Sequence, residues 1–176
     1  MPAEPTVRVW DPVIRVFHWT LVAAFATAFL VEEGGRLHDA AGYVVLGLIA
    51  LRLVWGVIGP EHARFASFVP GPAGLVAYLR GLARGKPARF LGHNPLGGVM
   101  IVLLLVTVFT AAASGWLMTT DRFWGVGWVE ELHEITAWLA LALVAVHVTG
   151  VLVSSLLHRE NLVRAMITGH KPVTVD

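Results

Sequence analysis

Residues 129–157 read VEELHEITAWLALALVAVHVTGVLVSSLL, and no Asp, Glu, Lys or Arg follows Glu134 in this stretch. The stretch is longer than the about 20 apolar residues that a membrane-spanning helix requires, so we expect it to tilt or to project from the bilayer. It also contains two histidines, His133 and His147, which are fourteen residues apart. Fourteen residues make nearly four helical turns, so both histidines lie on one face, about 21 Å apart along the axis.

Three further stretches are apolar enough to span a membrane, namely residues 13–31, 37–58 and 96–118. The whole chain of 176 residues is 56% hydrophobic and only 14% charged, with a mean hydropathy of +0.70. An average soluble domain is about 25% charged, so a soluble globular domain and a disordered chain are both disfavoured. We therefore expect an all-α protein, an integral membrane four-helix bundle that forms a single transmembrane domain over residues 1–176.

Charge placement predicts the orientation of the four spans. Two short loops are rich in acidic residues and contain Glu32, Glu33, Asp39, Asp121, Glu130 and Glu131 beside Arg36 and Arg122. The termini and the central loop are basic and contain Arg8, Arg15, Arg64, Arg80, Arg84, Lys86, Arg89, Arg159, Arg164 and Lys171. Because short basic loops stay in the cytoplasm, both termini and the central loop of this multi-pass protein are expected there. The net charge of only +1 argues against a nucleic-acid partner.

The segments outside the spans carry weaker signals. In the central loop, residues 71–84 place apolar side chains at near-helical spacing, which predicts a short amphipathic helix on the cytoplasmic membrane surface, although an ordinary solvated loop is the competing interpretation. We expect the tails, residues 1–9 and 169–176, to be mobile. Tryptophans near the predicted interfaces indicate an aromatic belt, and these are Trp10, Trp19, Trp116, Trp124 and Trp128.

Four histidines lie within or at the ends of the predicted spans, where an ionisable residue indicates a functional site. Their depths pair His18 with His147 near the cytoplasmic side, and His38 with His133 near the opposite side. Each pair joins two helices, which suits two imidazoles that ligate one haem iron from its two faces. Taken singly, each histidine has a competing interpretation as an interfacial residue bonded to water. A zinc site is disfavoured because its three or four ligands must meet at one depth.

Other residues near these histidines fit the same picture. Gly42 and Gly150 lie near the faces of His38 and His147, where glycine permits close approach of a flat macrocycle, although small residues are also ordinary packing in membrane helices. Arg52 is the one Arg, Lys, Asp or Glu deep in a predicted span. It needs either an anion, which a haem propionate supplies, or a route by which its side chain snorkels to the surface.

The remaining histidines carry less information. His93 precedes Asn94-Pro95, the expected entry to the third span, and is a candidate for a quinone head-group site or for stabilising that turn. Three histidines in basic surface segments are expected to be solvated, and these are His62, His158 and His170. The chain contains no cysteine, which excludes covalent haem attachment through Cys-x-x-Cys-His as well as iron–sulfur clusters.

Several segments together resemble the prokaryotic cytochrome b561 family, which includes the b-type cytochrome subunit of nickel–iron hydrogenases. They are Val9-Trp10-Asp11-Pro12, Phe17-His18-Trp19, Leu37-His38-Asp39-Ala40-Ala41-Gly42-Tyr43, Arg52-Leu53-Val54-Trp55-Gly56, Gly92-His93-Asn94-Pro95, Glu131-Leu132-His133-Glu134, His147-Val148-Thr149-Gly150 and His158-Arg159-Glu160-Asn161-Leu162. The resemblance covers nearly the whole chain and implies a four-helix membrane bundle with two haem b groups. At the motif positions, His18, His38, His133 and His147 are the implied iron ligands.

The leading expectation is transmembrane electron transfer through two haems, between membrane quinone and a periplasmic redox protein such as a c-type cytochrome, a hydrogenase or another dehydrogenase. One alternative is an enzyme, a superoxide:quinone oxidoreductase, which requires a cationic funnel that the acidic outer loops do not favour. A further alternative is a haem-free membrane scaffold or transporter. The direction of electron flow and the oligomeric state stay open, with a homodimer among the options.

Overall fold

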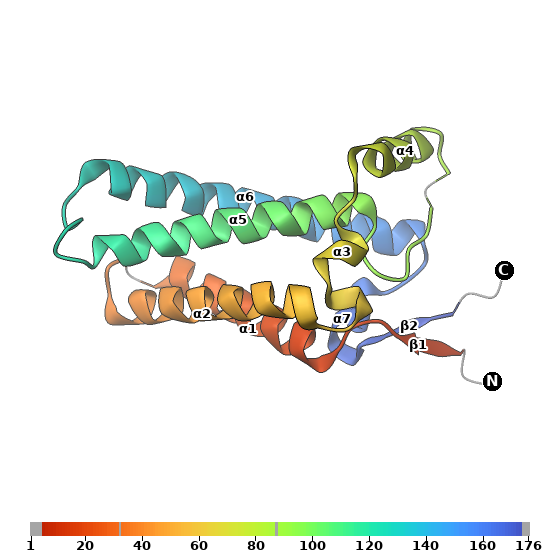
Figure 1. Ribbon diagram of the computed structural model, residues 1–176, viewed down its shortest axis with the longest axis horizontal. Helices are drawn as coiled ribbons and strands as arrows, with labels where there is room; N and C mark the ends of the chain where they lie inside the picture. The colour runs from red at the N-terminus through yellow and green to blue at the C-terminus, as the bar shows by residue number, and fades with distance from the viewer. Residues whose placement is uncertain (1–4, 32, 87, 174–176) are drawn as a thin grey trace. The chain divides into compact units, whose positions relative to one another are not determined.

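The computed structural model describes residues 5–31, 33–86 and 88–173, and it is almost entirely helical (Figure 1). Glu32, one of the predicted outer acids, lies outside these residues. In chain order the elements are β1 (Thr6–Arg8), α1 (Pro12–Leu30), α2 (Arg36–Ile58), the 3-10 helix η1 (Glu61–Ala63), α3 (Phe65–Phe68), α4 (Pro72–Ala83), α5 (Pro95–Met118), α6 (Gly127–Leu157), α7 (Leu162–Thr168) and β2 (His170–Pro172).

The four predicted spans are confirmed as the helices α1, α2, α5 and α6. Their most apolar windows have mean hydropathies of 1.7, 2.0, 2.5 and 2.2, and each helix is long enough to cross a membrane. Each span begins where the local sequence allows a helix to start. Asp11 caps α1, because its Oδ1 accepts hydrogen bonds from the backbone N–H groups of Val13 at 2.9 Å and Ile14 at 3.2 Å. Pro12 then occupies the first helical position, where its missing N–H costs nothing.

The chain groups into two compact units, to which all four long helices contribute. The first unit comprises residues up to Arg15 together with Trp55–Val102 and Val146 onward, and the second unit comprises Val16–Val54 and Leu103–Ala145. The core of the second unit is built from Ala24, Val45, Ile49, Val108 and Ala140. Ala140 is completely buried, and small residues of this kind let helix backbones approach closely.

The first unit has its own core, formed by Val9, Trp10, Ile14, Ala63 and Ala165. Trp10 is only 5% exposed, so its assignment to an aromatic belt is wrong. The other four tryptophans of the predicted belt are exposed, from 39% for Trp19 to 77% for Trp124. Trp55 packs against this core, and its indole Nε1–H donates a hydrogen bond of 3.2 Å to the capping carboxylate of Asp11. This bond ties the end of α2 to the start of α1.

The expectation of mobile tails is wrong for the described parts of both tails. Residues Thr6–Arg8 and His170–Pro172 pair as an antiparallel two-stranded sheet, β1–β2, with Val7 opposite Lys171. The carbonyl oxygen of Gly169 extends the pairing, since it accepts hydrogen bonds from the backbone N–H groups of Val9 and Trp10. A buried ion network holds β2 in place: the carboxylate of Glu160 pairs with Arg89 and, at 3.3 Å, with Lys171.

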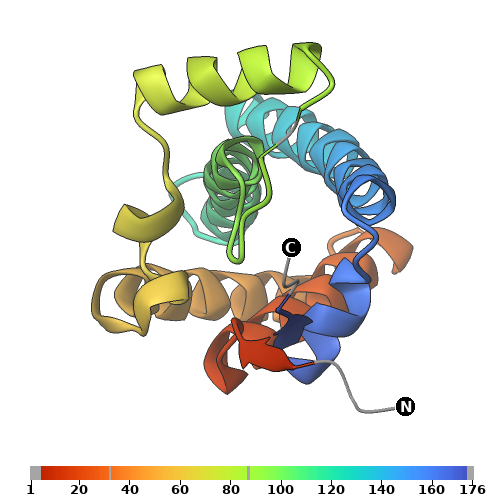
Figure 2. The same cartoon turned by 90° about the vertical axis from the view of Figure 1, so that its right-hand side faces the viewer.

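The predicted amphipathic helix in the central loop is confirmed as α4, which runs crosswise to the first turns of α5 within the first unit (Figure 2). Its Tyr78 ring is buried and packs edge-to-face on Phe90, with 5.8 Å between ring centroids. Val76, Leu79 and Leu82 stay exposed, beside the basic side chains of Arg80 and Arg84. The same loop also contains η1 and α3, which the sequence did not predict.

Candidate functional site

Two of the four predicted iron ligands lie next to each other in the second unit, with their rings edge-on. His38 belongs to the first turn of α2 and His133 to the second turn of α6, and both side chains are half-buried. Their ring centroids are 6.0 Å apart, and the ring planes are inclined at 74°. The structure therefore brings together the pair that the predicted depths had matched.

Each of these two rings is oriented by a backbone carbonyl of a neighbouring helix. Nδ1 of His38 lies 2.9 Å from the carbonyl oxygen of Ala28 in α1, and Nδ1 of His133 lies 2.8 Å from that of Ala111 in α5. A carbonyl oxygen can only accept a hydrogen bond, so Nδ1 is the donor in both contacts, which in a neutral imidazole leaves Nε2 without a proton. The lone pair of each imidazole is then on Nε2, which is the arrangement of a histidine prepared to ligate a metal.

The separation of the two rings matches ligation of a single iron. An imidazole nitrogen lies about 2.0–2.1 Å from a first-row metal ion that it binds, so two rings on opposite sides of one ion have centroids roughly 6 Å apart. The 6.0 Å between His38 and His133 agrees with this value. The donor set also fits, because two neutral imidazoles on opposite faces are a familiar ligand set for haem iron.

Gly115 of α5 contributes to the same site, although the sequence did not indicate it. A Cβ atom at this position would lie 3.0 Å from Cε1 and 3.1 Å from Nδ1 of His133, so glycine is what lets the imidazole pack against the α5 backbone. Gly115 follows Ala111 by four residues, so the glycine and the carbonyl acceptor lie on one face of α5. The helix thus offers the ring both an acceptor and the space to reach it.

The two glycines that the sequence singled out have no such contact. A Cβ atom built on Gly42 or Gly150 would meet no described atom within 4 Å. Gly42 is partly buried on α2 and Gly150 is exposed on α6. Neither glycine is required by close packing against protein, so their predicted role beside a haem stays a prediction.

The second predicted pair, His18 and His147, is divided between the two units. His18 lies on the part of α1 that belongs to the second unit, and its ring packs edge-to-face on Trp19 with 5.0 Å between centroids. His147 lies on the part of α6 that belongs to the first unit. Both are half-buried. Arg52 is 4% exposed, which places its side chain inside the protein and disfavours snorkelling to the surface.

His93 is packed between two aromatic rings of the first unit. Its ring centroid lies 4.6 Å from that of Trp10 and 4.9 Å from that of Phe68. The next residue, Asn94, caps α5, because its Oδ1 accepts a hydrogen bond of 2.8 Å from the backbone N–H of Gly97. Helix α5 begins at Pro95, so the predicted entry to the third span is confirmed.

The other histidines take no part in such a pair. His170 is exposed, as expected of a solvated histidine, whereas His62 and His158 are partly buried. Within the described ranges, no group of three or more His, Cys, Asp or Glu side chains lies close enough to hold a metal ion.

Comparisons with known proteins show which family the chain belongs to. A family model described as "Prokaryotic cytochrome b561" matches residues 9–169. Among curated proteins, the chain is 22% identical to a "Probable Ni/Fe-hydrogenase B-type cytochrome subunit" of Rhizobium leguminosarum bv. viciae, over 94% of this chain and 89% of that relative. The corresponding subunit of Azotobacter vinelandii is 28% identical over 94% of this chain and 88% of its own length. No solved structure gives a significant match. This chain of four apolar helices, with its adjacent histidines His38 and His133, belongs to the prokaryotic cytochrome b561 family.

Proposed function

We propose that the protein transfers electrons across the bacterial inner membrane, through two haem b groups, between the quinone pool and a redox protein on the periplasmic side. The observation that carries this proposal is the pair His38–His133, whose rings are 6.0 Å apart with both Nδ1 atoms bonded to backbone carbonyls. Family membership supports it, because the family consists of membrane cytochromes related to hydrogenase subunits.

Four histidines hold the two groups in this proposal. His38 and His133 ligate the iron nearer the periplasm, and His18 and His147 ligate the iron nearer the cytoplasm. The chain has no cysteine, so the macrocycles would be held by these histidines and by packing, in which Gly42 and Gly150 would leave room. Haem b, when bound, supplies reversible one-electron chemistry.

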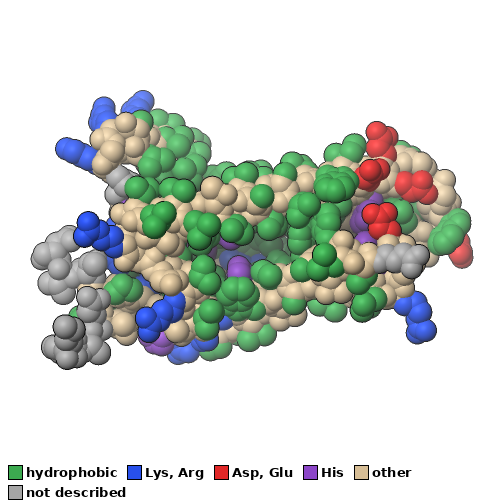
Figure 3. Space-filling view, turned by 180° about the vertical axis from the view of Figure 1, so that it is seen from behind, with side chains coloured by type: hydrophobic (Ala, Val, Ile, Leu, Met, Phe, Trp, Pro, Cys, Tyr) green, Lys and Arg blue, Asp and Glu red, His purple; other side chains and the backbone are tan. Residues whose placement is uncertain are grey.

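The orientation follows from the distribution of charge. The segments of the first unit contain ten of the 13 Lys and Arg residues, whereas the second unit contains seven of the 12 Asp and Glu residues. The α1–α2 and α5–α6 connections lie at one end of the second unit (Figure 1), and acidic side chains gather there beside histidine (Figure 3). By the positive-inside rule, the termini and the segment around α4 are cytoplasmic, and these two connections are periplasmic.

Two further residues have proposed roles on the cytoplasmic side. Arg52 is buried and follows His38 by fourteen residues on α2, which supports a proposed position at the depth of the inner pair, where its guanidinium would neutralise a haem propionate. A fixed cation there favours the reduced state of that haem. His93, held between the rings of Trp10 and Phe68, is proposed to bind the quinone head group at the start of α5.

The periplasmic partner is proposed from the relatives and from the surface charge. The relatives are named as probable subunits of Ni/Fe hydrogenases, including one from Escherichia coli (strain K12), which favours a hydrogenase-type partner. The acidic periplasmic connections favour a partner with a basic docking face, because complementary charge steers association. The same acidity weighs against superoxide, an anion, as the substrate.

The absorption spectrum and the haem content of the purified protein test the proposal. We expect a Soret band, a split alpha band after reduction with dithionite, and two haems per chain. Reduction by a quinol analogue in proteoliposomes, followed by oxidation from the opposite side with a membrane-impermeant oxidant, tests transfer across the bilayer. A protein without a Soret band after expression with sufficient haem would contradict the proposal.

A further inference from the structure

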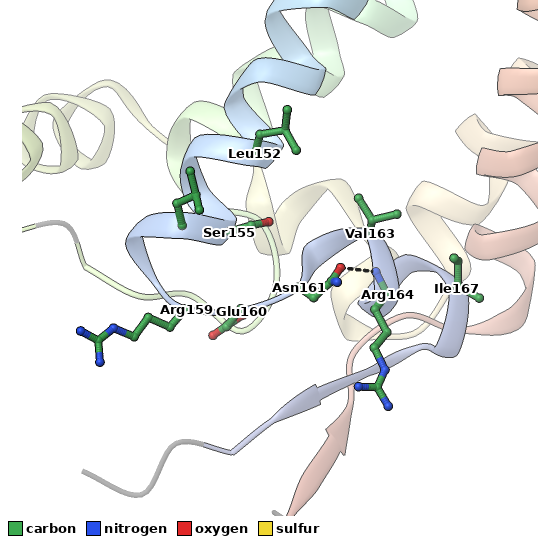
Figure 4. Close-up of a pocket in the computed structure, with 9 residues that line it drawn as sticks. Leu152, Ser155, Arg159, Glu160, Asn161, Val163, Arg164 and Ile167 are labelled. Carbon is green, nitrogen blue, oxygen red and sulfur yellow. Dashed lines mark hydrogen bonds between the residues drawn. The ribbon is translucent and has the colours of Figure 1, made fainter.

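An open groove lies in the first unit, where α6 ends and the chain turns into α7 (Figure 4). It has a volume of about 730 Å³. Its lining residues come from the last turns of α6, the connecting turn and α7, and they are Leu152, Ser155, Leu156, Arg159, Glu160, Asn161, Val163, Arg164 and Ile167. The groove takes no part in the proposed haem sites.

One side of the groove is apolar and exposed. Leu152 and Leu156, on the membrane-spanning helix α6, are 54% and 79% exposed, and Val163 and Ile167 on α7 are 44% and 54% exposed. The opposite face of α7 is packed in the protein core through Ala165 and Met166. The exposed residues are therefore the apolar side of an anchored helix, and they continue the apolar surface of the span beyond the end of α6.

The other side of the groove is positively charged. Arg159 and Arg164 are both exposed, and Figure 4 shows their guanidinium groups extending away from Leu152. Glu160, which lies between them in sequence, does not neutralise them, because its carboxylate is buried and already paired with Arg89 and Lys171. The groove thus offers apolar contact along the span and positive charge just past the end of the span.

The backbone at Arg159 indicates that its side chain matters. Helix α6 ends in a Schellman motif, in which the N–H of Glu160 bonds to the carbonyl oxygen of Ser155 at 3.0 Å and the N–H of Arg159 to that of Leu156 at 3.4 Å. Arg159 occupies the left-handed position of this motif, with φ 51°, where glycine is the favoured residue. An arginine at this position goes against the conformational preference, so the backbone strain here is not explained by the turn alone.

We propose that this groove binds one anionic phospholipid, with its headgroup on the positively charged side formed by Arg159 and Arg164 and an acyl chain along Leu152 and Leu156. The apolar side and the positively charged side of the groove follow each other along the direction of the span, which supports a membrane lipid rather than free phosphate as the ligand. The apolar side lies on the span, where acyl chains run, and the arginines lie beyond its end, where headgroups lie. A bound lipid of this kind covers the exposed side chains of α7 and fixes the α6–α7 turn.

The test uses the full chain, purified in mild detergent and incubated with either dioleoylphosphatidylglycerol or dioleoylphosphatidylcholine. After detergent washing, mass spectrometry counts the lipids retained per chain. We expect the wild type to retain about one phosphatidylglycerol, and the preference over phosphatidylcholine to fall about fivefold for each arginine that is removed. Arg159→Gly is the sharpest variant, because it removes the side chain while it relieves the left-handed backbone, so that a loss of lipid does not reflect misfolding.

Matched variants separate the two halves of the groove. Arg164→Gln should lower the preference as Arg159→Gly does, whereas Leu156→Ser should weaken retention of both lipids without changing the preference. Arg80→Gln, an equal change of charge on α4, should leave both quantities unchanged. The proposal is wrong if Arg159→Gly keeps the full preference, if Arg80→Gln lowers it equally, or if millimolar inorganic phosphate displaces the retained lipid. It is also wrong if the wild type shows no preference for phosphatidylglycerol over phosphatidylcholine. If, in that case, Arg159→Gly dissociates a dimer, the groove is an interface between two copies of the chain and not a lipid site.

Discussion

His133 and Ser114 share one backbone acceptor, the carbonyl oxygen of Ala111. Nδ1 of His133 lies 2.8 Å from this oxygen, and the hydroxyl of Ser114 lies 3.0 Å from it, as the longer branch of a bifurcated hydrogen bond whose shorter branch, 2.7 Å, goes to the carbonyl oxygen of Thr110. Ser114 is only 2% exposed, so the shared acceptor is shielded from water on this side. Because the acceptor belongs to the rigid helix α5, it fixes the orientation of the imidazole before any ligand binds. This is the arrangement that tunes a metal-ligating histidine through its second nitrogen.

Gly115→Ala is expected to disturb this histidine selectively. The added Cβ would lie 3.0 Å from Cε1 of His133, so the ring must move by a few tenths of an ångström and its hydrogen bond to Ala111 must lengthen. We expect a shifted low-spin signal in electron paramagnetic resonance for one haem and partial loss of that haem. Gly47→Ala is the matched control, since its Cβ meets no described atom within 4 Å and should leave both signals intact. Identical spectra for both variants would show that Gly115 does not position the ligand.

Arg52→Gln is expected to lower the midpoint potential of one haem, the haem assigned to His18 and His147. If Arg52 pairs with a propionate as proposed, removing this buried cation favours the oxidised state of the haem. The charge of the propionate is the same in both redox states, so only the interaction between the Arg52 cation and the iron differs between them. We therefore expect the midpoint potential to fall by on the order of 50 mV. Arg52→Lys keeps the charge and should shift the potential less. Potentiometric titration followed at the alpha band measures both, and a shift of the other haem alone would contradict the assignment.

Asp11→Ala is expected to destabilise the first unit. The carboxylate caps α1 through Val13 and Ile14 and accepts the indole N–H of Trp55, so the variant loses a helix cap and leaves a partly buried donor unpaired. Loss of such a cap typically costs about 1 kcal/mol. The thermal unfolding midpoint in detergent should fall, and Trp55→Phe should reproduce the part due to the indole bond. Asp121→Ala, at an exposed turn, should leave the midpoint unchanged.

Lys171 should make stability depend on pH in the alkaline range. Burial lowers the pKa of Lys171 below 10.5, although the carboxylate of Glu160 opposes this change. Between the lowered pKa and 10.5 the unfolded chain binds more protons than the folded chain, so stability rises with pH through this window. Lys171→Met removes this contribution. As pH rises from the lowered pKa of Lys171 to 10.5, the unfolding midpoint of the wild type should therefore increase relative to that of Lys171→Met. A difference between the two midpoints that stays constant over this pH range would contradict the prediction.

The parts of the fold that face lipid could be predicted from the sequence, whereas the parts built from distant residues could not. A span of about 20 apolar residues is imposed locally by the bilayer, so the four long helices were found within one or two residues of their ends. The strands β1 and β2 have three residues each and come from opposite ends of the chain, so neither carries a local pattern. The burial of Trp10 follows from the same long-range packing, with Ala63 and Ala165.

The candidate site divides in the same way. The pairing of His38 with His133 followed from depth alone, because helix length converts residue number into position along the membrane normal. Their acceptors could not be predicted, since the carbonyl groups of Ala28 and Ala111 are backbone atoms that any residue supplies. Gly115 was missed because it is one of 18 glycines, and its contact with the ring of His133 appears only in the folded structure.

The haem content of His38→Ala, His133→Ala and the double variant tests most directly whether these two residues hold one iron between them. The pyridine haemochrome assay gives the number of haems per chain, and the alpha band identifies the haem that is lost. We predict that each single variant retains one haem of two, that both lose the same spectral component, and that the double variant loses no more than either. Two haems retained in both single variants, or different components lost, would contradict the account.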